Sequence, residues 1–198
     1  DRNMETLSPV QTAQPSFDGD AIMIWLFVIL MSLPSMAWAN GETLYVRPAG
    51  GSYGTELGTS YANAWDGFIN IVYNAANTAG QVDPGDTLYV CGTHTAEQME
   101  IYQDATFPLR IDINLDCTDD PGTIAPTAQN YAIYVEASYI TIHDGTFNGT
   151  GAALYPVLIN TNGGVNTDVS GVTFYGNTVV NGINAAAECL GFYGSGVT

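Results

Sequence analysis

The sequence has very little positive charge. It contains no lysine and three arginines against 20 aspartates and glutamates in 198 residues, so that its formal net charge is −17. Proteins that bind nucleic acids neutralise phosphates with Lys and Arg, and docking on an anionic membrane relies on the same residues. The composition therefore excludes a nucleic-acid-binding function and disfavours a membrane-surface protein.

Charged residues of both signs make up only 12% of the chain, whereas 46% of the residues are hydrophobic and 11% are aromatic. That balance is typical of a folded chain and not of a disordered one. The 22 glycines, together with many asparagines and threonines, indicate tight turns between short strands. We therefore predict an acidic, turn-rich, all-β protein.

Long hydrophobic runs are rare, and the longest, Ala21–Leu33, is too short for a comfortable bilayer span of about 20 residues. It is followed by Ala37-Trp38-Ala39, which matches the end of a secretory signal peptide with cleavage after Ala39. Asp18 and Asp20 precede the run where a signal peptide is basic. The alternative is a buried strand or helix that stays in the mature protein, and residues 1–39 are treated as a separate segment.

The pattern of the remaining chain divides it into residues 40–86 and 87–198. In the first part, Trp65, Phe68 or Ile69, and Val72 recur at helical spacing and predict a helix over 62–76, with Asn63 as a candidate cap. In the second part, short apolar runs are separated by Gly, Asn or Asp. Strands are expected at 44–48, 87–91, 110–116, 133–135, 139–142, 155–159, 172–175, 178–180 and 190–193.

An internal repeat favours one arrangement of these strands. The segments 138–149 and 170–182 both contain a polar residue, Ile or Val, Thr and an apolar residue, then a turn, Thr with an apolar residue, and Asn-Gly. Residues 195–198 begin the same sequence pattern again. Repeats of this kind predict a β-solenoid, in which each turn of the chain stacks on the last. A β-sandwich is the alternative, because its strands also recur at short intervals.

Several motifs resemble secreted proteins of the pectate-lyase-like superfamily. Tyr45–Gly51 and Gly58–Trp65 are similar to the N-terminal cap of these proteins, Gly85–Thr95 to their first coil, and Asp119–Ile124 to the turn that closes the next coil. The resemblance covers about residues 43–182. It implies a right-handed parallel β-helix with a short N-terminal capping helix in 40–86, and coils in 87–198 that continue or stack beyond residue 198.

The densest acidic cluster is a candidate calcium site. Residues 112–116 read Asp-x-Asn-x-Asp, but Cys117 and Thr123 stand where an EF-hand has Gly and Glu, so an EF-hand is excluded. Hard cations prefer several carboxylates, which makes calcium the expected ion, and a solvated acidic face is the alternative. The candidate ligands are Asp112, Asp116, Asp119 and Asp120.

Three cysteines occur, and two of them are expected to pair. Cys91 and Cys117 lie 26 residues apart, about one coil, so a disulfide between neighbouring coils is predicted and Cys189 is left for another partner. Two alternatives are small buried side chains and a zinc site of these two cysteines with His94, which lacks a fourth ligand. Asn148, in Asn-Gly-Thr, is a candidate glycosylation site.

No catalytic residue can be placed on this sequence from the resemblance. Lyases of the superfamily commonly use Arg or Lys as the base, with calcium held by Asp, and here Arg47 and Arg110 lie in the cap strand and an early coil. His143, beside Asp144, is expected to be a turn residue. Outward tyrosines are one way to stack on sugar rings, although in a solenoid they also form structural ladders.

We therefore expect an extracellular or cell-surface building block without catalytic activity, of the fibre, surface or adhesive kind. Its expected partners are copies of itself, joined end to end into fibres, and a polysaccharide; calcium is the one cofactor considered. Neither nucleic acid nor, in the mature form, a membrane is expected. The alternative is the N-terminal part of a secreted polysaccharide lyase or glycoside hydrolase.

Overall fold

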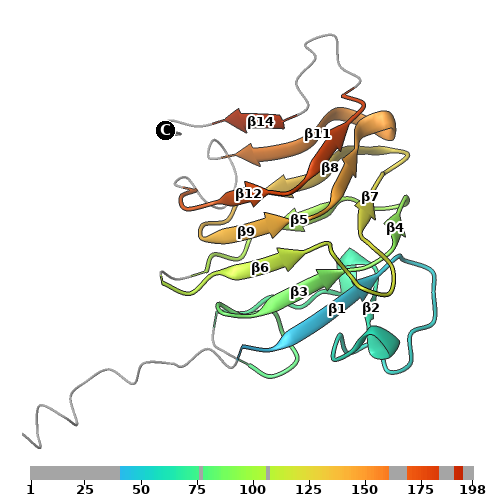
Figure 1. The fold of residues 1–198 in the computed structure, drawn as a ribbon, viewed down its shortest axis with the longest axis vertical. Helices are drawn as coiled ribbons and strands as arrows, with labels where there is room; N and C mark the ends of the chain where they lie inside the picture. Colours follow the sequence, from blue (N-terminus) through green and yellow to red (C-terminus); the bar gives the residue numbers. More distant parts are fainter. Residues whose placement is uncertain (1–40, 76–77, 106–107, 161–168, 183–189, 194–198) are drawn as a thin grey trace, which may run out of the picture. The chain divides into compact units, whose positions relative to one another are not determined.

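The computed structural model describes residues 41–75, 78–105, 108–160, 169–182 and 190–193, all within the unit Trp38–Thr198. These residues form an all-β structure of short strands, with three single-turn 3₁₀ helices and no α-helix among them (Figure 1). Within these ranges no helix is long and apolar enough to cross a membrane.

The described strands form three sheets in which every pair of neighbours is parallel. The first sheet has the order β12 (Thr173–Tyr175), β9 (Ile140–His143), β6 (Ile111–Asn114), β3 (Thr87–Val90), β1 (Thr43–Arg47), β2 (Trp65–Asp66). The second has the order β13 (Thr178–Val180), β10 (Thr146–Asn148), β7 (Thr123–Ile124), β4 (Thr93–His94). The third has the order β14 (Leu190–Tyr193), β11 (Ala152–Asn160), β8 (Gln129–Val135), β5 (Met99–Ile101).

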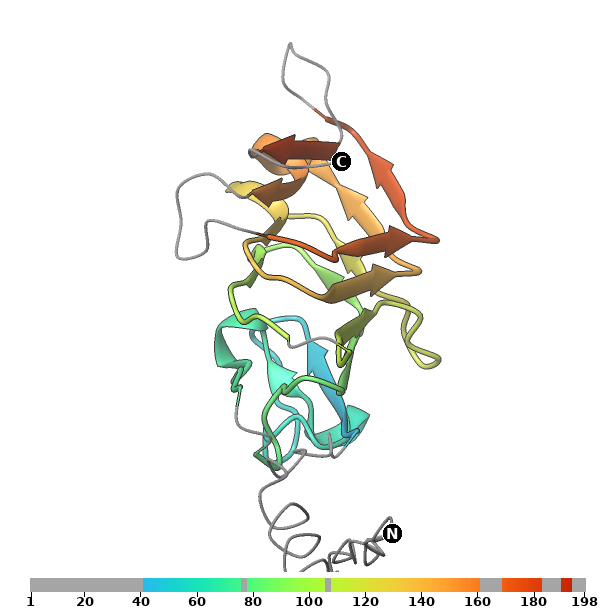
Figure 2. The same ribbon diagram turned by 90° about the vertical axis from the view of Figure 1, so that its left-hand side faces the viewer.

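The chain visits the three sheets in turn, and each visit starts again beside the previous one (Figure 2). We call β3–β5, β6–β8, β9–β11 and β12–β14 the first to fourth repeats. Thr141 pairs with Thr173 and Thr146 with Thr178, so the sequence repeat coincides with the structural one. Parallel sheets built from successive turns of one chain are consistent with the predicted parallel β-solenoid.

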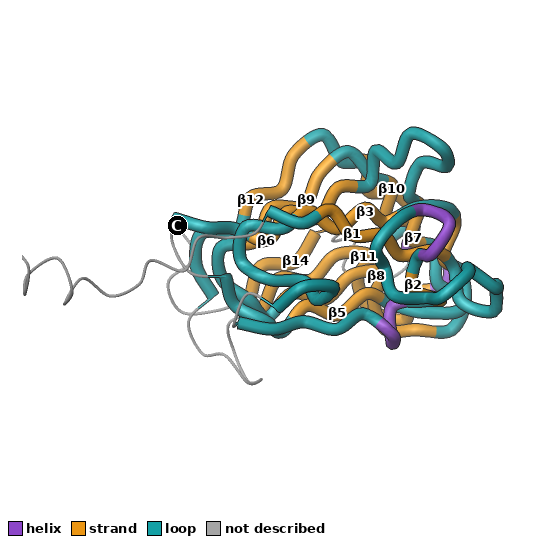
Figure 3. The backbone as a smooth tube through the Cα atoms, turned by 90° about the horizontal axis from the view of Figure 1, so that it is seen from below, coloured by secondary structure: helices purple, strands orange, loops and turns teal. Residues whose placement is uncertain are grey.

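The core lies between the three sheets, which enclose it when the stack is seen from below (Figure 3). Strand residues alternate between core and solvent, as the two-residue period of a strand requires. One inward row of the first sheet is Leu88, Ile113 and Ile142, paired in register and each 0% exposed. The parallel register therefore places like side chains on top of one another, although the repeats differ in length.

The predicted helix over 62–76 is wrong. This segment instead holds η1 (Tyr61–Asn63), β2 and η2 (Phe68–Asn70), and Tyr73 forms a bridge with Val82. Gly67 has φ +82, which ends any helical run, and Trp65 pairs with Val46 of β1. The apolar spacing was misleading because only Trp65 and Phe68 turn inward, whereas Val72 is exposed. The Oγ atom of Ser60, and not Asn63, caps η1 by accepting a hydrogen bond from the Asn63 amide.

Candidate functional site

The outward face of the first sheet carries two rows of polar side chains. The register aligns Tyr45, Tyr89, Asn114, His143 and Tyr175 in one row. Two residues earlier on each strand, the second row is Thr43, Thr87, Asp112, Thr141 and Thr173. Ring stacking follows the first row, with 5.4 Å between the ring centroids of Tyr45 and Tyr89.

His143 lies on this face with a carboxylate at each ring nitrogen. Its Nε2 lies 3.1 Å from Oδ1 of Asp112 on the neighbouring strand, and its Nδ1 lies 2.7 Å from Oδ2 of Asp144. The ring stacks on Tyr175 with a centroid distance of 4.9 Å and an interplanar angle of 4°. Both ring nitrogens are thus occupied by carboxylates, which leaves neither free to take a proton from a substrate.

Two opposing effects act on the pKa of His143. Burial lowers it, but the hydrogen bonds to Asp144 and Asp112 and the negative charges of both carboxylates outweigh burial, so that the pKa is raised above its ordinary value. An imidazolium between two carboxylates is an ion pair that joins the second repeat to the third. The sequence interpretation of His143 as a turn residue missed the partner on β6.

The third sheet carries a second polar cluster, which we call the tyrosine–carboxylate cluster: Glu100, Tyr102, Tyr131, Tyr134, Glu136 and Asn160. The Tyr102 hydroxyl donates to Oε2 of Glu100 at 2.9 Å, and the Tyr134 hydroxyl donates to Oε1 of Glu136. Nδ2 of Asn160 donates to the Tyr134 hydroxyl at 2.8 Å. Ring centroids lie 5.9 Å apart for Tyr102 and Tyr134, and 5.2 Å apart for Tyr131 and Tyr134.

The tyrosines of this cluster stay neutral over a wide pH range. Burial, with hydrogen bonding to Glu136, raises the pKa of Tyr134 to about 12, and burial together with Glu100 also raises the pKa of Tyr102. Glu136 is only 2% exposed, whereas Glu100 is exposed. Aromatic faces beside carboxylate acceptors are groups that can contact a ligand rich in hydroxyls.

The four candidate calcium ligands do not gather around one point. Asp112 lies on β6 and contacts His143, while Asp116, Asp119 and Asp120 are exposed in the segment that follows this strand. Within the ranges given above, no three His, Cys, Asp or Glu side chains are grouped so that they hold a metal ion. Calcium binding at these residues stays a prediction from the sequence.

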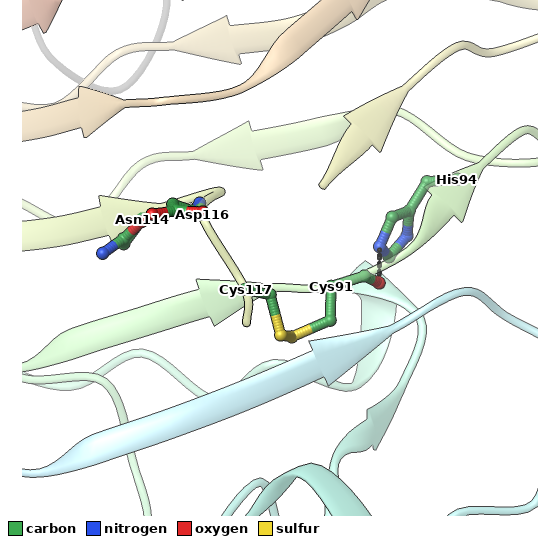
Figure 4. The surroundings of a disulfide bond; sticks show 5 residues. All are labelled: Cys91, His94, Asn114, Asp116 and Cys117. Atoms are coloured by element: carbon green, nitrogen blue, oxygen red, sulfur yellow. Dashed lines mark hydrogen bonds between the residues drawn. A yellow bond between two sulfur atoms is a disulfide. The ribbon is translucent and has the colours of Figure 1, made fainter. Parts of the chain in front are cut away.

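The disulfide predicted between Cys91 and Cys117 is confirmed. Its Cα atoms are 5.3 Å apart, both cysteines are buried, and the bond joins the segments that follow β3 and β6 (Figure 4). The bond also excludes the zinc site of Cys91, His94 and Cys117, because neither sulfur is left as a thiolate. Cys189 lies outside the described residues.

His94 and Glu97 join the first repeat to residues 41–86 before it, which we call the cap. Nδ1 of the fully buried His94 lies 2.7 Å from Oε1 of Glu97, and its Nε2 lies 3.2 Å from the Cys91 carbonyl oxygen. Glu97 also accepts hydrogen bonds from the backbone amides of Phe68 at 2.6 Å and Ala49 at 3.2 Å. The Phe68 ring stacks on His94 with 4.1 Å between centroids. Sequence analysis missed Glu97, whose partners lie 29 and 48 residues away.

Both arginines of the described ranges are engaged in the fold. The Arg47 guanidinium lies between the rings of Tyr53 and Tyr61, 4.1 and 4.2 Å from their centroids. Arg110 donates from Nε to Oγ1 of Thr141 at 2.7 Å. Its Nη2 donates to Oγ1 of Thr173 at 2.8 Å and to the carbonyl oxygens of Ile140 and Gly171. Neither arginine is placed as the base of a lyase.

The candidate glycosylation residue, Asn148, ends β10 on a turn. Its Oδ1 accepts hydrogen bonds from the amide and hydroxyl of Thr150, at 3.0 and 2.7 Å, and from Nδ2 of Asn181 at 3.0 Å. Thr150 is exposed and Asn148 is partly exposed. Glycosylation of Asn148 stays a prediction.

Comparison with known proteins adds no relative. No protein-family model matches the chain, and neither the curated proteins nor the solved structures contain a match. The likeness to the pectate-lyase-like superfamily therefore rests on the motifs quoted above and on the parallel sheets.

Proposed function

We propose that this chain is an extracellular, non-catalytic building block: a right-handed parallel β-solenoid that associates with copies of itself through one end of its stack. The observation that carries the proposal is the state of the fourth repeat. In the described part of the chain, β12, β13 and β14 are edge strands at the same end of the stack, one in each sheet. Unpaired edges are templates for pairing with another chain.

The chemistry of the polar side chains supports a structural role. Arg110 and His143 have their donors engaged by neighbouring repeats, and the Arg47 guanidinium lies against the rings of Tyr53 and Tyr61. Proton abstraction from a uronide needs a free base beside a bound substrate. In the described ranges these three side chains stabilise the stack instead.

The disulfide supports an extracellular location. Disulfides persist in oxidising compartments and are rare in the cytosol. The bond between Cys91 and Cys117 is buried and links two repeats, as expected for a structural disulfide. A surface with an excess of acidic groups also keeps the protein soluble at high concentration.

Negative-stain electron microscopy of the purified chain, with sedimentation velocity over a range of concentrations, tests the proposed function. We expect assemblies larger than the monomer, held without any added ligand. Dispersed single particles that sediment as monomers at every concentration would contradict self-association.

A polysaccharide-directed function is the second candidate, and the tyrosine–carboxylate cluster is the observation that favours it. Tyr102 is 40% exposed beside the exposed Glu100, so both are open to a sugar ring. The assay is binding to, and cleavage of, uronide-containing polysaccharides with and without calcium. Binding that is lost in Tyr102→Ala would support recognition, and release of unsaturated or reducing ends would establish an enzyme.

A further inference from the structure

Arg47 and Arg110 differ in how their donors are used. Arg110 donates hydrogen bonds to the third and fourth repeats. In the described ranges the Arg47 guanidinium donates none, and it forms no ion pair, since the ion pairs found there belong to His94 and His143. In a chain of net charge −17, Arg47 is thus a cation without an acidic partner in the part that the structure describes.

The two tyrosine rings leave the hydrogen-bonding edge of Arg47 open. The ring centroids of Tyr53 and Tyr61 lie 4.1 and 4.2 Å from Cζ of Arg47. A guanidinium donates in its own plane, so rings against its faces take up none of its five N–H groups. Nε is enclosed without a partner, whereas the two Nη groups are not enclosed. The open edge is therefore the end of the guanidinium that carries both Nη groups.

Both rings have anchors of their own. The Tyr53 hydroxyl donates to the Pro48 carbonyl oxygen at 2.9 Å. Gly51 lies against the Tyr53 ring, and a Cβ atom at this position would be 2.1 Å from Cζ of the ring. Tyr61 belongs to η1, which Ser60 caps. Arg47, Tyr53 and Tyr61, which we call the Arg47 cradle, are therefore positioned before any ligand arrives, which reduces the entropy lost on binding.

The carboxylates near the Arg47 cradle bind backbone amides. Asp66 pairs with Arg47 across β1 and β2, but its Oδ1 accepts a hydrogen bond from the Gly51 amide at 3.0 Å. Glu97 accepts hydrogen bonds from two backbone amides of the cap. Burial raises the pKa of Tyr53, Arg47 opposes this, and Asp66 and Glu97 add to it, so both carboxylates are within electrostatic reach. Their charges disfavour a ligand with several negative charges.

We propose that the Arg47 cradle binds one carboxylate of an otherwise uncharged ligand through the two Nη groups of Arg47. A carboxylate offers two oxygens in one plane, which match two parallel donors of a guanidinium. A guanidinium that is partly removed from water and has no acceptor gains more from this contact than a hydrated one. The cradle lies at the end of β1, within residues 47–61, which the structure describes without a gap (Figure 1). The inference does not depend on the proposed self-association.

Titration of the 198-residue chain with N-acetylglycine, followed by heteronuclear NMR at constant ionic strength, tests the site. We expect a saturable shift of the Arg47 Nε–H signal and of the Gly51 amide, which lies against the cradle. N-acetylglycinamide has the same shape without the charge and should cause no saturable shift. Inorganic phosphate and sulfate should bind at least tenfold more weakly, because they carry more negative charge.

Three variants locate the binding. Arg47→Lys keeps the charge but loses the planar pair of donors, and it should weaken binding at least tenfold. Arg110→Lys is the matched control, because the donors of Arg110 are already used within the fold, and it should leave the affinity unchanged. Gly51→Ala displaces the Tyr53 ring while Arg47 stays, and it should also weaken binding. This third variant decides the question if Arg47→Lys does not fold.

Four results would overturn the proposal. Absence of a saturable shift, or an equal response to N-acetylglycinamide, means that Arg47 serves the fold alone. Phosphate or sulfate that binds as tightly as the carboxylate means an unselective anion site. Equal weakening by Arg47→Lys and Arg110→Lys places the carboxylate elsewhere on the chain. An affinity that neither Arg47→Lys nor Gly51→Ala changes excludes the cradle as the site.

Discussion

In the part of the chain that the structure describes, each arginine and His143 have structural contacts. Arg110 binds acceptors on the third and fourth repeats, Arg47 is held between two tyrosine rings, and His143 lies between two carboxylates. Hydrogen bonds to charged groups stabilise a fold more than neutral ones do. Arg110 and His143 therefore connect parts of the chain that are distant in sequence.

Removal of the Arg110 side chain should loosen the third and fourth repeats. Arg110→Met keeps much of the aliphatic stem but loses the donors to Thr141 and Thr173, and we expect a loss of about 2 kcal/mol in the free energy of unfolding. Urea titration followed by circular dichroism measures it. Thr173→Val, which removes one acceptor only, serves as the comparison and should cost less; an equal cost would argue against the shared anchor.

Stability should depend on pH through His143. Its pKa is raised in the folded chain, so its contribution is complete below the ordinary histidine pKa and disappears as the pH rises through the raised value. We expect His143→Gln to lose on the order of 1 kcal/mol near pH 5 and much less near pH 9. Urea unfolding of both proteins in the presence of a chelator measures the difference, and a pH-independent gap would contradict the ion pair.

At the scale of elements, side chains outside the short strands hold these strands in position. The strands β4 and β7 have two residues each, and the disulfide lies close before β4, while Glu97 follows it. Two-residue strands contribute few ladder hydrogen bonds of their own. Their positions therefore depend on the bond between Cys91 and Cys117 and on the contacts of Glu97.

Loss of the disulfide should destabilise the first two repeats. The bond closes a loop of 26 residues, for which the chain-entropy model predicts a contribution of about 3.5 kcal/mol. We expect the Cys91→Ser, Cys117→Ser double variant to lose a free energy of that order in urea unfolding. Reduced wild-type protein should match the variant, and unchanged stability in both would mean that the bond constrains little.

Substitution of Glu97 should release the cap without unfolding the stack. Glu97→Ala removes the acceptor of the Phe68 and Ala49 amides and the partner of His94. We expect at least tenfold faster amide hydrogen exchange at Phe68 and Ala49, with unchanged exchange in β9. Faster exchange throughout the chain would show that the cap and the repeats unfold as one unit.

At the scale of the whole described stack, stability should decrease from the inner repeats to the fourth repeat. Ile142 and Phe174 are neighbours in one inward row, but Ile142 is 0% exposed and Phe174 is only partly buried. Cavities in a closed core are costly, whereas a site at a surface can relax or admit water. Substitution by alanine at Ile142 and at Phe174 should therefore lower the free energy of unfolding by different amounts.

Ile142→Ala should cost about 3 kcal/mol, and Phe174→Ala less, although phenylalanine is the larger side chain. Urea unfolding is measured at low protein concentration, so that self-association does not bury Phe174. A larger loss at Phe174 than at Ile142 would mean that the fourth repeat is covered as well as the third.

Patterns within short segments of the sequence were enough to predict part of this architecture. The strict alternation of Ile111, Ile113 and Leu115 with polar residues defines an inward and an outward face without any tertiary information. The repeat of 138–149 in 170–182 gave the register that pairs Thr141 with Thr173. The spacing of Cys91 and Cys117 was sufficient to predict their bond, because one coil separates them.

Only the tertiary structure determined the conformation of the cap and the partners of the clustered polar side chains. Trp65 and Val72 have helical spacing, yet the pairing of Trp65 with Val46 and the positive φ of Gly67 prevent a helix. The partners of Glu97, His143 and Arg110 come from other repeats, so no window of sequence contains them. Patterns along the chain determine which face of a strand is buried, whereas the stacking of repeats determines which side chains meet across it. Long-range parallel pairing overrides local propensity here because each repeat buries its apolar row only against the next.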